Sequence, residues 1–131
     1  MDIDYAFLCD AATEHAGKLN ALGIGIDQLA AATLPATHPR LTFVARLRFE
    51  PEDDGDRHFR VRAVDADGHE MGNVEGDMSV HFAPEDRMTG ANLVVDLVNL
   101  EFIAAGPHEV SLTVDGNQVV TLPLEVSRTP A

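Results

Sequence analysis

The chain has 131 residues, of which 45% are hydrophobic and 24% are charged, as expected for one globular domain spanning residues 1–131. A net charge of −13 argues against nucleic acid or anionic lipid as partner, and no stretch approaches the ~20 apolar residues that span a bilayer. The acidic start, which lacks the basic residues of a leader peptide, predicts a cytoplasmic protein.

The N-terminal part contains two predicted strands, at residues 3–9 and 18–25. The single cysteine, Cys9, has apolar neighbours and is expected to be a buried, unreactive thiol. Gly23 and Gly25 form a Gly-x-Gly, but a dinucleotide-binding turn needs a third glycine where Gln28 stands, and a long helix after it. We therefore expect a strand in which the two glycines permit a bulge or a close backbone approach.

Residues 27–39 interrupt the strand pattern. Pro35 and Pro39 end any helix, so the sequence predicts at most one helical turn here.

Alternation of apolar and polar residues predicts strands over 41–49, 57–63, 74–82, 91–102, 108–114 and 119–126. In 91–102 the alternation changes phase near Val98 and Asn99, which suggests a β-bulge. In the last pair, apolar residues face each other when Leu112 lies opposite Val120. That pairing requires a three-residue loop at 115–117. In total, about eight short strands predict an all-β fold, a two-sheet antiparallel β-sandwich.

Four arginines occupy the outward positions of the strands at 41–49 and 57–63. If these strands form a hairpin, Arg46 and Arg48 face Arg62 and Arg60, and like charges directly opposite one another destabilise a strand pair. Either acids on adjacent strands, such as Glu75 and Asp77, offset them, or an acidic partner or second subunit does.

The segments 5–9 and 93–98 are apolar on both faces. A sandwich strand of this kind needs a cover on its outer side, from a helix, from the 27–39 segment or from another subunit. Together with the four arginines, these segments form the predicted interaction surface for a protein partner or a homo-oligomer, represented by Tyr5, Phe7 and Val95.

No pattern of catalytic or zinc-binding residues emerges from the sequence. Two acidic loops resemble calcium-binding loops, the first with Asp53, Asp54 and Asp56 and the second with Asp65 and Asp67. They lie at opposite ends of one predicted strand, so they cannot share an ion. The sequence predicts a binding or assembly module that is not an enzyme and has no cofactor; the alternative is a calcium-responsive domain.

Several short motifs, at Asp10–Ala12, Gly17–Gly23, Pro35–Pro39, Asp65–Gly68 and Val114–Gly116, occur in this order along the chain. In this order, they resemble a family of small bacterial proteins classed as a domain of unknown function. The resemblance implies a β-sandwich of immunoglobulin-like type and implies no activity.

Overall fold

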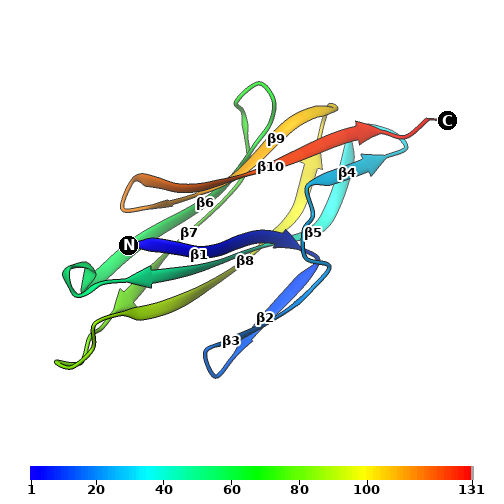
Figure 1. Cartoon of the computed structure of the whole chain (residues 1–131). Helices are drawn as coiled ribbons and strands as arrows, with labels where there is room; N and C mark the ends of the chain where they lie inside the picture. The colour runs from blue at the N-terminus through cyan, green and yellow to red at the C-terminus, as the bar shows by residue number, and fades with distance from the viewer. Residues whose placement is uncertain (131) are drawn as a thin grey trace.

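The computed structural model describes residues 1–130, which form ten strands and one short 3-10 helix (Figure 1). In chain order they are β1 (Asp2–Cys9), β2 (Ala11–His15), β3 (Lys18–Leu22), β4 (Gln28–Ala31), β5 (Ala36–Phe49), η1 (Pro51–Asp53), β6 (Gly55–Val64), β7 (Glu70–Val80), β8 (Thr89–Phe102), β9 (Gly106–Val114) and β10 (Asn117–Arg128). The all-β prediction is confirmed, with ten strands instead of about eight.

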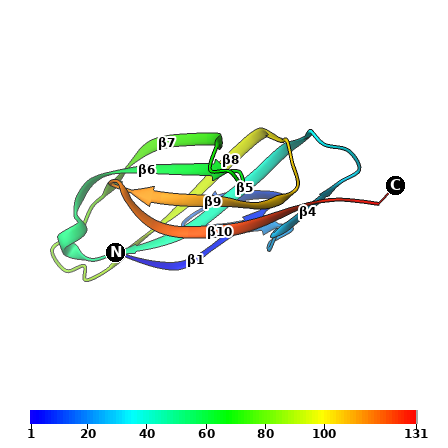
Figure 2. The same ribbon diagram turned by 90° about the horizontal axis from the view of Figure 1, so that it is seen from above.

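The strands form three sheets. One is three-stranded in the order β1-β5-β8, one is five-stranded in the order β4-β10-β9-β6-β7, and β2 pairs with β3 alone. The five-stranded sheet curls over the three-stranded one, as the two views show (Figures 1 and 2). Because β4 pairs with β10 in parallel, the fold is not wholly antiparallel as predicted, and the structure does not show an immunoglobulin-like strand order.

The predicted hairpin of β5 and β6 is wrong. β5 pairs with β1 and β8, whereas β6 pairs with β7 and β9 in the other sheet. Between them, η1 has Pro51 in its first turn and lies where the chain crosses from one sheet to the other. The four arginines therefore do not share one face.

Apolar side chains from the facing sides of the two sheets form the core. The most completely buried of them alternate along their strands, as period-2 patterning requires. They include Leu41, Phe43, Leu47 and Phe49 from β5, Val61 from β6, Val110 and Leu112 from β9, and Leu124 from β10.

The predicted phase change in β8 is present, and its cause is a single residue. Leu93, Val95 and Leu97 are buried, and burial resumes at Leu100. Asn99 between them has a left-handed backbone, with φ of 54°. The register with β5 is the same on both sides of Asn99, so no residue is inserted and the predicted bulge is wrong.

The β9–β10 connection is a two-residue turn, and the predicted three-residue loop is wrong. Asp115 and Gly116 both have positive φ, 50° and 80°, the geometry that two-residue hairpins favour. The register then shifts between Gln118 and Val120, which brings Val120 opposite Leu112 as predicted.

The segment 27–39 contains no helical turn, and it is not the interruption of the strand pattern that the sequence predicted. Residues 28–31 form β4, which adds to the free edge of β10 and pairs Leu29 with Val126. β4 is short and its partner is the last strand of the chain, so local patterning gave no sign of it.

Candidate functional site

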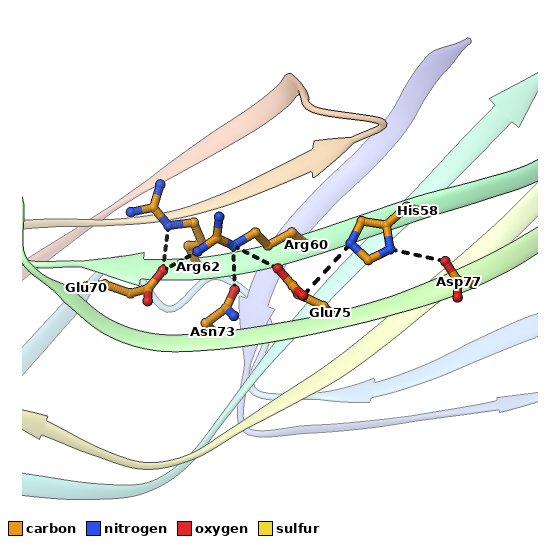
Figure 3. A network of polar contacts seen from close by, with 7 residues as sticks. All are labelled: His58, Arg60, Arg62, Glu70, Asn73, Glu75 and Asp77. Carbon is orange, nitrogen blue, oxygen red and sulfur yellow. Dashed lines mark hydrogen bonds and ion pairs between the residues drawn. The ribbon is translucent and has the colours of Figure 1, made fainter.

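Two arginines of β6, Arg60 and Arg62, form ion pairs with acids on the adjacent strand β7 (Figure 3). Glu70 Oε1 accepts hydrogen bonds from Arg60 Nη2 at 2.7 Å and from Arg62 Nε at 2.8 Å. Arg60 Nε also lies 3.4 Å from Glu75 Oε1 and donates to Asn73. The first of the two sequence interpretations, neutralisation by neighbouring acids, is thus confirmed for this pair.

Asp77, the second acid named for that role, instead contacts His58. The distance from Asp77 Oδ1 to His58 Nδ1 is 3.1 Å.

Two arginines of β5, Arg46 and Arg48, share one carboxylate on the other sheet. Arg48 and Arg46 both contact Asp4 of β1, and Arg46 Nη1 donates to Asn92 Oδ1 at 2.8 Å. Asp4 lies at a register irregularity of β1, between Ile3 and Tyr5. The four arginines thus have three carboxylate partners, Asp4, Glu70 and Glu75, which offset most of their positive charge within the chain.

Of the predicted apolar interaction residues, Tyr5 and Phe7 lie near the surface and Val95 does not. The rings of Tyr5 and Phe7 stack with their centroids 5.9 Å apart, and Tyr5 is 41% exposed. Val95 is buried in the core between the sheets, so it belongs to no surface.

The sequence predicted a cover for residues 5–9 and 93–98, which lie in β1 and β8, and the β2–β3 hairpin packs against β5 and β8. Cys9, Thr42 and Val44 are fully buried at outward positions of the three-stranded sheet. β2 contacts β5 and β8, and Asn92 Nδ2 donates to the carbonyl oxygen of Gly17 at the hairpin tip, at 3.0 Å. This cover is therefore within the chain, and it comes from the β2–β3 hairpin and not from the 27–39 segment.

Cys9, at the end of β1, is fully buried, so the expected burial is confirmed. Burial raises the pKa of the Cys9 thiol above its usual value, which disfavours the nucleophilic thiolate.

The Gly-x-Gly lies after β3, in the connection that leads to β4. The expected strand through these glycines is wrong, and the expected close backbone approach is confirmed. The amides of Gly25 and Ile26 both donate to the carbonyl oxygen of Leu8, at 3.0 and 3.1 Å. A Cβ added to Gly23, whose φ is 66°, would lie 2.2 Å from Asp10 Oδ2. Two of the amides that a phosphate would need are thus engaged with the chain.

An open groove of about 600 Å³ runs along the β2–β3 hairpin, which projects below the other strands in Figure 1. Leu22 and Ile24 beside it are 72% and 61% exposed. None of the described residues that line it is ionisable. This hairpin groove is lined by Ala11, Ala12, Thr13, Leu19, Asn20, Ala21, Leu22 and Ile24.

The first acidic loop uses its carboxylates within the chain. Asp53 accepts a hydrogen bond from the amide of Glu50, which holds the pKa of Asp53 below its usual value, and it lies 3.2 Å from the N-terminal amine. Asp56 accepts a hydrogen bond from the hydroxyl of Ser79, and Asp54 ends η1. Among residues 1–130, Asp53, Asp54 and Asp56 do not form a group with metal-ligand spacing.

The second acidic loop borders a cavity of about 160 Å³ at the opposite end of β6, between the β6–β7 and β8–β9 turns at the top of Figure 1. Ligand atoms of Asp65, Asp67 and His69 lie within 4.8 Å of one another. The amide of His69 donates to Asp65 Oδ1 at 2.8 Å and lowers the pKa of that carboxyl. This end cavity is lined by Asp65–Asp67, His69, Met71, Glu101, Ile103–Ala105 and His108.

The sequence reasoning did not identify the hairpin groove or His108. Residues 11–15 show no alternation, so their strand was not predicted, and Leu22 was only placed within a predicted strand at 18–25. A signal for His108 was present, because it has the same parity as Val110 and Leu112 in its strand and so points inward with them.

Within the described residues 1–130, the structure contains no helix long and apolar enough to cross a bilayer. No curated protein matches this chain. The family of unknown function DUF6941 matches residues 4–127, nearly the whole length. The chain therefore belongs to this family of unknown function, as the order of its sequence motifs indicated.

Proposed function

We propose that this domain is a non-catalytic binding module that associates with a second copy of itself through the hairpin groove. The observation that carries the proposal is the exposure of Leu22 and Ile24 beside an uncharged groove. Exposed apolar patches of this kind mark interaction sites on soluble proteins.

Charge selects the place where two copies can meet. Each copy has a net charge of −13, so contact between acidic surfaces is repulsive. The hairpin groove has no ionisable residue among its described lining, and there the repulsion is smallest. An isologous dimer uses the same patch on both copies, and an apolar patch is complementary to itself.

The placement of the potential nucleophiles supports a non-catalytic role. Cys9 is fully buried under the hairpin, and the hydroxyl of Ser79 donates to Asp56. The same negative charge supports a protein partner in preference to nucleic acid or membrane, and we propose a cytoplasmic location.

The test is the mass of the protein in solution, measured by sedimentation over a range of concentrations. We expect the unmodified protein to form a dimer, and Leu22→Asp and Ile24→Asp each to weaken it at least tenfold, because a carboxylate would be buried without a partner. Met88→Asp is the matched control, since Met88 is an exposed apolar residue outside the groove, at 57% exposure. A protein that is monomeric at every concentration, or a dimer that both groove variants leave intact, would overturn the proposal.

A further inference from the structure

His108 is a polar residue in an otherwise apolar inward-facing series of β9. It is 4% exposed, while Val110 and Leu112 further along the same face are 1% and 0% exposed. The edge of its ring meets that of Phe102, with centroids 5.3 Å apart. A buried imidazole needs hydrogen-bond partners for both ring nitrogens, and a carbon side chain would fill the position without that requirement.

The hydrogen bonding of His108 determines which nitrogen carries the proton. Nδ1 lies 2.9 Å from the carbonyl oxygen of Gly106, and a carbonyl oxygen can only accept, so Nδ1 is the donor. In the neutral ring, the lone pair is then on Nε2. Within residues 1–130, no side-chain nitrogen or oxygen that is sealed from solvent lacks a partner. No hydrogen bond from the described residues reaches Nε2, so this nitrogen is not sealed from solvent, and the His108 ring borders the end cavity.

The rim of the same cavity presents a mixed set of oxygen and nitrogen donors. Asp65 Oδ1 is occupied by the amides of Asp67 and His69, which leaves Oδ2, 3.5 Å from His69 Nδ1. One ligand atom from each of Asp65, Asp67 and His69 lies within 4.8 Å of the other two, the spacing of atoms that share one ion. Carboxylate oxygens and imidazole nitrogens together are ligands of zinc and of other divalent transition metals, whereas calcium needs six to eight oxygen ligands.

The charges around the cavity also favour a cation. Glu101 adds a third carboxylate to the lining, and none of the described lining residues is lysine or arginine. The negative electrostatic potential of a protein with net charge −13 would repel an anion from this cavity.

We propose that the end cavity binds a divalent transition-metal ion of the zinc type, held by Asp65, Asp67 and His69, with His108 Nε2 accepting a hydrogen bond from a water on the ion. Three protein ligands leave a coordination position open for that water. The calcium alternative is thereby replaced at this loop by an ion that accepts nitrogen. This site lies apart from the hairpin groove, so the two proposals stand or fall separately.

The test is calorimetric titration of the full chain, without an affinity tag, with zinc chloride. We expect saturable binding of one ion, weakened at least tenfold by His69→Ala and by Asp67→Asn, and about tenfold by His108→Gln, as for other residues that orient a metal-bound group. His15→Ala is the matched control, because His15 is an exposed histidine of the β2–β3 hairpin, outside the cavity.

Three results would overturn the proposal. They are the absence of saturable heat, an affinity that neither His69→Ala nor Asp67→Asn lowers, and calcium chloride binding at least as tightly as zinc chloride. An unchanged affinity in His108→Gln, with the fold verified by circular dichroism, would overturn the assigned water contact.

Discussion

The outer faces of the two large sheets differ in how much of their surface is exposed to solvent. On the five-stranded sheet, Arg60 and Arg62 remain in water and pair with Glu70 of the neighbouring strand. On the three-stranded sheet, Arg48 also pairs with Asp4, but Thr42 and Val44 further along the same face are fully buried where β2 packs against β5 and β8. Ion pairs can complete a charged face, whereas an apolar face requires another element of structure.

The two solutions differ in energy. Burying a valine side chain contributes about 1.5–3 kcal/mol, whereas an exposed ion pair contributes about 0–1 kcal/mol. We therefore expect the covered face to contribute to stability and the charged face mainly to solubility.

The largest expected effect comes from placing a charge under the hairpin. Val44→Asp should lower the free energy of unfolding by at least about 3 kcal/mol, since it buries an unpaired carboxylate. The milder Val44→Ala should cost about 2 kcal/mol through the cavity it leaves. Urea unfolding measures both.

The matched control is the same charge on the other sheet. Ser111 pairs with Arg62 in the register of β6 and β9, so Ser111→Asp should change stability by less than about 0.5 kcal/mol. Equal losses for Val44→Asp and Ser111→Asp would remove the distinction between the two faces.

A smaller effect should appear as pH dependence on the charged sheet. Asp115 accepts a hydrogen bond from the amide of His58 and another from Arg57, and both hold the pKa of Asp115 below its usual value. A folded-state pKa that is depressed adds stability above the unfolded pKa of about 3.9, and this stability is lost as pH falls through the folded pKa.

Asp115→Asn should therefore destabilise the protein at pH 6 by no more than about 1 kcal/mol, because the pair is partly exposed. The difference should shrink toward pH 3. Asparagine tolerates the left-handed backbone of this turn, so the hairpin itself is retained. Urea unfolding across that pH range is the measurement, and parallel profiles for the two proteins would contradict the assignment.

The smallest effect is expected for one arginine of the charged face. Arg62→Met keeps an apolar stem and removes the contact with Glu70, which Arg60 still binds. The loss should be below about 0.5 kcal/mol and smaller still in 1 M salt. A loss above about 1.5 kcal/mol in urea unfolding would show that this face is a structural network.

The sequence was informative where structure depends on local patterning. Alternation located β5, β6, β7 and β9, because side chains of a strand point to its two faces in turn. It could not assign strands to sheets, since the residues after Phe49 look like a loop whether the chain turns back or crosses over. β4 was not predicted because it pairs with the last strand of the chain.

The candidate sites also differ in how far local sequence patterning predicted them. Neutralisation of Arg60 by Glu75 follows from neighbouring strands and was predicted. The hairpin groove is local to residues 11–24 but lies on a strand, β2, that showed no alternation, whereas the end cavity combines segments whose proximity only the tertiary fold establishes. For His108 the inward parity was readable, but the cavity it borders was not.

The two amides that bond to Leu8 have a consequence for engineering. Gly25 and Ile26 return the chain to the end of β1, so the segment 10–24 starts and ends at nearly the same place in the structure. A segment inserted in this way can be lengthened or exchanged without altering the register of either large sheet. Any graft in its place must still shield Val44, and the turn at Ala16 and Gly17 is the natural point at which to display a foreign peptide.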